Sequence, residues 1–78
     1  MIEDREALKR RNTLGSRLKL KRLQNGFTRE IIGNELGLTN GAIATHENDR
    51  CLPNPYMLYD YANLYETTME WLLFGEKK

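Results

Sequence analysis

The chain has 78 residues, 40% of them hydrophobic and 29% charged, with a net charge of +1. This length suffices for one small domain and excludes a separate catalytic domain beside it. The composition is typical of a folded globular protein and too apolar for a wholly disordered chain. Because so small a domain has a marginal core, we expect a partner subunit to add to its stability.

Few residues could carry out chemistry. The single cysteine, Cys51, excludes an internal disulfide, and the single histidine leaves no Cys/His cluster for zinc. Without a nucleophile or acid/base motif, we predict no enzyme, no metal and no cofactor. The chain lacks the run of roughly 20 apolar residues of a membrane span, and its start lacks a signal-peptide run. These features predict a cytoplasmic protein with no membrane contact.

The charges are unevenly distributed along the chain. Residues 9–29 include eight basic residues and no acidic one, whereas residues 51–78 include two basic and four acidic residues. A block of like charge is either a solvated surface or the binding face for a polyanion. The charge pattern alone favours these two interpretations about equally.

Glycines and prolines divide the chain into short segments, and the apolar residues of each have helical rather than alternating spacing. The predicted fold class is therefore all-α, with five short helices. Their expected ranges are 14–25, 29–36, 40–47, 55–65 and 69–74. Residues 1–12 are expected to form a weak helix or an arm, and residues 76–78 a tail.

Several of these helices are preceded by residues that favour the N-cap position. Thr28 and Thr39 are expected to cap the second and third helices. Before the last helix, Thr67 with Glu70 fits a capping box, and Thr68 is the alternative cap. These local signals predict where the helices begin.

Residues 28–48 have the layout of a helix-turn-helix: a helix, a break at Gly37 and Leu38, and a second capped helix. In this motif a short turn containing glycine sets two helices nearly perpendicular, so that the second can enter a DNA major groove. Small residues are needed where the helices cross, and Gly33 and Ala42 supply them. A helical hairpin with a glycine turn has a similar pattern and no DNA-binding role.

A family resemblance covers about Thr13 to Gly75. It rests on the run TREIIGNELGLTNGAIATHEN, on LPNPYMLYDYANLYETTMEWLLFG after it and on LGSRLKLKRLQNGFTRE before it. These runs resemble the Cro/C1 type of helix-turn-helix regulators, the group of lambdoid phage repressors and Cro proteins. The resemblance implies a lambda-repressor-like domain over residues 13–75. It also implies a sequence-specific regulator, a repressor, that binds a palindromic operator in double-stranded DNA as a homodimer.

The resemblance further implies roles for single residues. The start of the third helix reads base edges in such repressors, and the matching positions are Asn40, Gly41 and Thr45. This helix carries no Arg or Lys, which favours a larger share for DNA shape and phosphate contacts. The expected phosphate contacts are Arg17, Lys19, Lys21, Arg29, Thr39, Asn48 and Arg50.

Two other implied features concern structure and assembly. Arg22 and Glu47 match a basic and an acidic position that pair in related repressors, so an ion pair is predicted here. The last helix has more apolar surface than a small core can bury, and a homodimer interface through Trp71, Leu73 and Phe74 is expected. The alternative is that Trp71 and its neighbouring leucine complete the monomer core, which leaves only Leu73 or Phe74 exposed.

A second function class is compatible with the same fold. An antitoxin or anti-repressor would use it chiefly to bind a protein, such as a toxin, and the small, weakly polar side chains of residues 40–46 favour this alternative. Binding to mixed DNA at several salt concentrations discriminates between the two, because phosphate neutralisation makes affinity fall steeply with salt.

Overall fold

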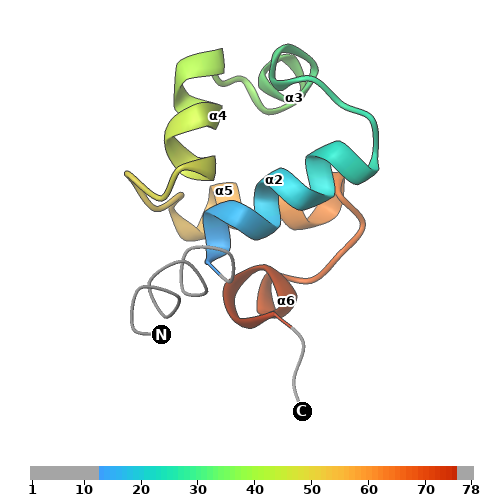
Figure 1. The fold of residues 1–78 in the computed structure, drawn as a ribbon, viewed down its shortest axis with the longest axis vertical. Coiled ribbons are helices and arrows are strands. Elements are labelled where there is room, and N and C mark those ends of the chain that lie inside the picture. The colour runs from blue at the N-terminus through green and yellow to red at the C-terminus, as the bar shows by residue number, and fades with distance from the viewer. Residues whose placement is uncertain (1–12, 76–78) are drawn as a thin grey trace, which may run out of the picture.

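The computed structural model describes residues 13–75, and this part of the chain forms five helices and no strand. The helices, labelled in Figure 1, are α2 (Leu14–Gln24), α3 (Arg29–Leu36), α4 (Asn40–Glu47), α5 (Pro55–Leu64) and α6 (Met69–Phe74). The predicted all-α class with five short helices is confirmed. The expectations for residues 1–12 and 76–78 lie outside the described residues. None of the described helices is long and apolar enough to cross a bilayer.

Each helix begins after a side chain that caps its first free backbone N–H groups. In every case the cap oxygen accepts a hydrogen bond from the backbone nitrogen three residues further on, an interaction that contributes about 1 kcal/mol. The caps are Thr13, Thr28, Thr39, Asn54 and Thr68. Of the two candidates before α6, Thr68 is therefore the cap, and Thr67 is not.

A three-residue turn, residues 37–39, joins α3 to α4. Gly37 has a φ of 72°, in the left-handed region that glycine adopts without strain. The N–H of Leu38 donates to the carbonyl oxygen of Gly33 across 2.8 Å. A Cβ on Gly33 would overlap the carbonyl oxygen of Leu38, so the small size of Gly33 is required at the turn. The predicted need for a small residue at position 33 is thus met at the turn between the two helices.

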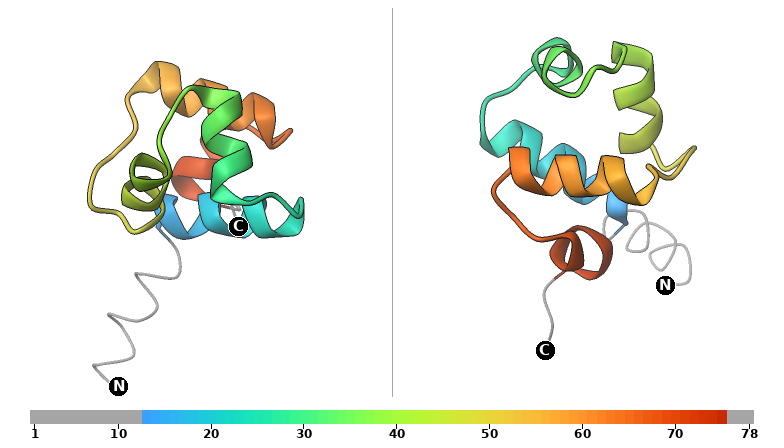
Figure 2. Two further views of the ribbon diagram at one scale, coloured as in Figure 1. Left: turned by 90° about the horizontal axis from the view of Figure 1, so that it is seen from above. Right: turned by 180° about the vertical axis from the view of Figure 1, so that it is seen from behind.

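The pair of helices α3 and α4 lies at one end of the molecule, and α6 lies at the opposite end (Figure 1). Between them α2 crosses the middle of the molecule, and the view from behind shows α5 crossing there as well (Figure 2). Helix α4 packs on α2 and α3, whereas α6 packs on α2 and α5. The start of α4 is therefore far from α6 and is not covered by it.

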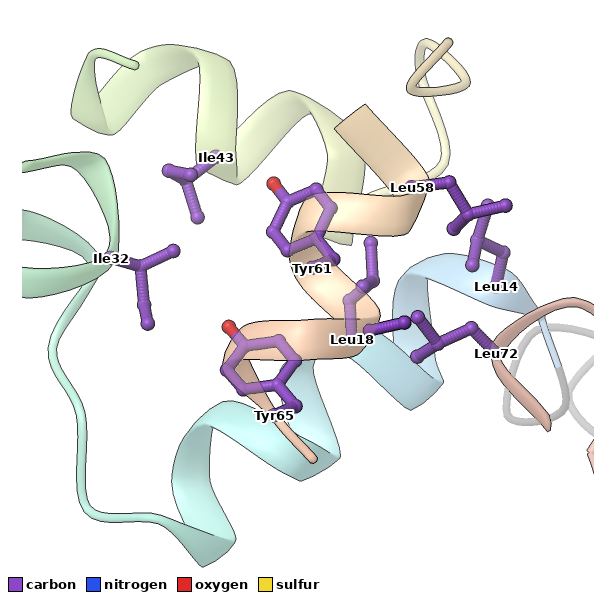
Figure 3. Close-up of a cluster of buried hydrophobic side chains, with 9 residues drawn as sticks. Leu14, Leu18, Ile32, Ile43, Leu58, Tyr61, Tyr65 and Leu72 are labelled. Atoms are coloured by element: carbon purple, nitrogen blue, oxygen red, sulfur yellow. The ribbon is translucent and has the colours of Figure 1, made fainter. Parts of the chain in front are cut away.

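The centre of the core receives one fully buried side chain from each helix. These five are Leu18, Ile32, Ile43, Tyr61 and Leu72 (Figure 3). The ring of Tyr61 stacks on that of Tyr65 with centroids 6.0 Å apart, and its hydroxyl oxygen lies 2.9 Å from Nδ1 of His46. Burial raises the pKa of both tyrosines and lowers the pKa of His46. The core thus holds the α3–α4 unit against the rest of the fold.

Candidate nucleic-acid interface

The first turn of α4 carries exposed residues on the outside of the molecule. Asn40 and Gly41, both predicted to read bases, are exposed. Thr39 is exposed too, and its hydroxyl oxygen accepts from the N–H of Ala42 across 3.1 Å. Thr45 is half-buried, and its hydroxyl donates to the carbonyl oxygen of Gly41 across 2.8 Å. Thr45 therefore presents its methyl group and its remaining oxygen lone pairs, since its proton is already used within the helix.

A surface hollow of about 660 Å³ lies beside the start of α4. Its walls come from the second half of α2, the segment up to the start of α3, and the first residue of α4. The lining residues are Lys19, Arg22, Leu23, Gly26, Phe27, Thr28, Arg29, Glu30 and Asn40. The structure thus brings together three of the predicted DNA contacts from three different helices: Lys19, Arg29 and Asn40.

The predicted ion pair between Arg22 and Glu47 is present. Nε of Arg22 lies 2.7 Å from Oε2 of Glu47, and Nη2 lies 3.2 Å from Oε1. The third nitrogen of Arg22, Nη1, donates to the carbonyl oxygen of Phe27 across 3.0 Å. Because its three nitrogens all have protein partners, Arg22 lines the hollow as a structural residue.

Arg29 also binds the carboxylate of Glu47, a contact that was not predicted from the sequence. Its Nε donates to Oε1 of Glu47 across 3.2 Å, while the Glu47 side chain is only 1% exposed. The Arg29 side chain is 35% exposed, and its two terminal nitrogens have no hydrogen-bond partner among residues 13–75. A cation near a helix N-terminus is disfavoured by the helix dipole, and Glu47 compensates for this position of Arg29.

Two of the predicted phosphate contacts belong to another face of α2. Nε and Nη2 of Arg17 donate to the carbonyl oxygens of Leu72 and Leu73 across 2.7 and 2.6 Å, and burial lowers the pKa of this guanidinium. Nζ of Lys21 lies 4.9 Å from the ring centroid of Trp71. Both side chains thus contact α6 and hold it against α2, and phosphate contact by Arg17 and Lys21 stays a prediction.

The turn after α4 brings two more predicted residues to the surface. Asn48 and Arg50 are exposed, with Asp49 between them. A second hollow, of about 400 Å³, is lined by Thr13, Ser16, Lys19, Glu47, Asn48 and Asp49. Lys19 lines both hollows, so the exposed cation of α2 lies between the start of α4 and the turn that follows its end.

The residues predicted to form a dimer interface lie at the other end of the molecule. Trp71 is half-buried and packs against the core, whereas Leu73 is 41% exposed and Phe74 69% exposed. The last turn of α6 therefore presents two neighbouring apolar side chains to the outside. In the described part of the chain no cluster of His, Cys, Asp or Glu could hold a metal ion.

Two capped helices joined through a left-handed glycine, the second with its first turn exposed, define a helix-turn-helix unit. The family model described as "Helix-turn-helix domain" matches residues 15–78, so the chain belongs to the helix-turn-helix family. No curated protein sequence matches the chain.

Among solved structures, the crystal structure of the P22 c2 repressor protein in complex with synthetic operator 9T, in the presence of Tl+, is similar. Its TM-score is 0.79 at 23% sequence identity, over 82% of this chain and 97% of that one. The two proteins share a fold, so the predicted resemblance to a phage repressor is confirmed at the level of the helix-turn-helix fold.

Proposed function

We propose that this protein is a transcriptional regulator that binds double-stranded DNA with sequence specificity and represses by blocking polymerase. One observation supports this most strongly: the exposed first turn of α4 adjoins a hollow that Lys19 and the partly exposed Arg29 line. A protruding helix beside cations is what major-groove docking requires. The similar P22 c2 repressor was crystallised with an operator, which agrees with this role.

Phosphates would be bound around the edge of α4. Lys19 and Arg29 supply the charge beside the hollow, and the backbone amide of Thr39 lies at the start of α4, where a helix favours anions. Asn48 and Arg50 extend the same surface beyond the end of α4. These contacts would fix the orientation of α4 and provide most of the salt-dependent affinity.

Sequence preference would come from the exposed face of α4. The amide of Asn40 can pair with the N6 and N7 edge of adenine, whereas Thr45 can offer its methyl group to thymine. Gly41 has no side chain and allows a close approach of the backbone. With so few side chains for direct contact, DNA shape would contribute the rest of the discrimination.

The functional form would be a homodimer joined through α6. Leu73 and Phe74 form the apolar contact, next to the half-buried Trp71. A two-fold dimer would place two α4 helices about one turn of DNA, ~34 Å, apart on a palindromic operator. Such an interface would also add to the marginal stability of this small domain.

The alternative function is a protein-interaction module of the antitoxin or anti-repressor type. It is favoured by the absence of Lys and Arg from α4 and by the large exposed side chains of Leu52, Tyr56 and Tyr59. Such exposed apolar residues are typical of protein contacts when they lie together.

Binding of a mixed-sequence DNA duplex at several salt concentrations tests the proposal. We expect binding at low salt, with log K falling linearly against log salt at about −0.9 per phosphate contacted. Absence of binding at the lowest salt would favour the protein-interaction module.

A further inference from the structure

Asp49, in the turn after α4, adopts a backbone conformation that few residues tolerate. Its φ is 61°, in the left-handed region, although it is not a glycine. Apart from glycine, Asp and Asn are the residues that enter this region with least strain. An aspartate also brings a negative charge close to the surface where phosphates would bind. Both features call for a compensating interaction.

The carboxylate of Asp49 makes two hydrogen bonds to the start of α2. Oδ2 accepts from the hydroxyl of Thr13 across 2.6 Å, and Oδ1 accepts from the N–H of Gly15 across 2.9 Å. The N–H of Gly15 is in the first turn of α2, where amides have no acceptor within the helix. A carboxylate at this position is also favoured by the helix dipole.

A second observation indicates that this contact is built into the fold. A Cβ on Gly15 would overlap the carbonyl oxygens of His46 and Glu47 as well as Oδ1 of Asp49. Glycine at position 15 therefore permits the start of α2 to lie directly against the end of α4. The two segments are joined by backbone packing and by the side chain of Asp49.

The same turn carries two of the residues proposed to bind phosphate. Asn48 and Arg50 flank Asp49, and both are exposed, with no side-chain hydrogen bond among the described residues. The N–H of Arg50 donates to the carbonyl oxygen of Thr45 across 3.0 Å, which ties the turn to α4. Asp49 ties it to α2 from the other side. With both attachments, the path of the turn is fixed before any ligand binds.

We propose that Asp49 is a positioning residue of the DNA-binding surface, which holds Asn48 and Arg50 in place by anchoring their turn to the first turn of α2. This inference rests on the proposed function. A turn that is already fixed by these hydrogen bonds loses less conformational entropy when DNA binds. This gain in binding free energy outweighs the repulsion between the Asp49 carboxylate and nearby phosphates.

Two variants of Asp49 lose the same charge. Comparing them separates the positioning of the turn from the repulsion between the carboxylate and DNA phosphates. Asp49→Asn keeps an acceptor oxygen for Gly15 and tolerates the positive φ, whereas Asp49→Ala removes both hydrogen bonds. Binding to a mixed-sequence duplex is measured across salt concentrations, at a temperature where circular dichroism shows both variants folded. We expect Asp49→Asn to bind at least as tightly as the wild type. Asp49→Ala should bind about fivefold more weakly, with a salt slope reduced by about 1.

The same comparison in an Asn48→Ala/Arg50→Ala background tests whether Asp49 acts through its neighbours. We expect the difference between the two Asp49 variants to fall below about twofold there, because the side chains being positioned are gone. Equal binding by the two variants in the wild-type background, or an unchanged difference in the double-alanine background, would overturn the inference.

Hydrogen exchange of the Gly15 amide tests, independently of DNA binding, whether the Asp49 carboxylate anchors the turn to α2. Asp49→Ala should accelerate this exchange about tenfold and Asp49→Asn should leave it nearly unchanged, because the acceptor is lost only in the first. If the wild type fails to bind DNA, the proposed function fails. Unaltered exchange in Asp49→Ala would instead show that the carboxylate does not anchor the turn.

Discussion

Arg29 at the start of α3 donates from Nε to Oε1 of Glu47 at the end of α4, across 3.2 Å. The same carboxylate accepts two hydrogen bonds from Arg22 of α2. One buried glutamate therefore connects the three helices that surround the larger hollow. It neutralises Arg22 within the protein and leaves the terminal nitrogens of Arg29 available to a ligand.

Glu47→Gln is expected to destabilise the fold by about 3 kcal/mol, because it leaves two guanidinium groups around a site that no longer carries a charge. Urea unfolding followed by circular dichroism measures the difference. Glu35→Gln, at an exposed position of α3, is the matched control and should change stability by less than about 0.5 kcal/mol. Equal stabilities for the two variants would show that the buried carboxylate is not a structural connection.

Lys19→Ala and Lys21→Ala remove the same charge from opposite sides of α2. Lys19 lines both hollows, while Lys21 lies over Trp71. The first substitution should weaken binding to duplex DNA and reduce the salt slope by about 1, whereas the second should leave the slope unchanged. Fluorescence anisotropy at several salt concentrations provides both slopes. Equal effects of the two substitutions on the salt slope would mean that DNA binding depends on the net charge of the protein and not on the position of Lys19.

Helix positions and class could be predicted because their signals are local. The first helix was expected to end at Asn25 and ends at Gln24, and the third ends at Glu47 as expected. Caps and glycine stops act within a few residues, so they can be read without knowing the fold. The choice between Thr67 and Thr68 was open because both can cap the same helix.

The faces of the helices were predicted less well. Arg17, Lys19 and Lys21 were grouped as one basic set, although consecutive residues of a helix are rotated by about 100°. Positions four apart share a face, and this spacing alone could have separated Arg17 and Lys21 from Lys19. Which of the two faces would be covered by α6 required the tertiary structure.

The Arg22–Glu47 pair was implied by the family resemblance, whereas other contacts between distant segments were not predicted from the sequence. The bonds of Asp49 to Thr13 and Gly15 join residues 36 and 34 positions apart. The pairing of Arg29 with Glu47 depends on how α3 and α4 are packed around the turn at Gly37. Periodicity and capping preferences describe single helices, so they do not predict these pairings.

Asn40→Ala should relax sequence preference and retain binding to mixed DNA. Loss of a paired contact to adenine reduces discrimination at one base pair by about 1–3 kcal/mol, while the phosphate contacts are unaffected. The specificity ratio between a selected operator and a mixed duplex measures the change. Asn34→Ala, an exposed asparagine on α3, is the control and should keep the ratio. An intact ratio in Asn40→Ala would refute base reading by this residue.

Phe74→Asp is expected to convert a dimer to monomers. The Phe74 side chain is 69% exposed at the end of α6, and a charge there would be buried without a partner in a two-fold contact. Sedimentation equilibrium gives the oligomeric state. Tyr56→Asp, on the exposed outside of α5, should leave the dimer intact. Dimers that persist in Phe74→Asp would locate the interface elsewhere.

His46 is expected to make the fold less stable as the pH falls. Burial lowers its folded pKa below the ordinary value of 6.5, so the unfolded chain takes up the proton first. Its contribution is fully present above pH 6.5 and is lost as the pH falls toward the folded pKa. Thermal unfolding between pH 8 and pH 5.5, compared with His46→Gln, isolates this effect. The same pH dependence in both chains would exclude His46 as its source.

The most direct test of whether the α3–α4 surface contacts DNA is an NMR titration. Amide chemical shifts of the labelled wild-type protein are followed as a mixed-sequence duplex is added. The largest shifts are predicted around Arg29, Asn40 and residues 48–50, with much smaller shifts on the outer face of α5. Shifts concentrated on α5 around Tyr56 and Tyr59, or no shifts at low salt, would contradict the proposed binding surface.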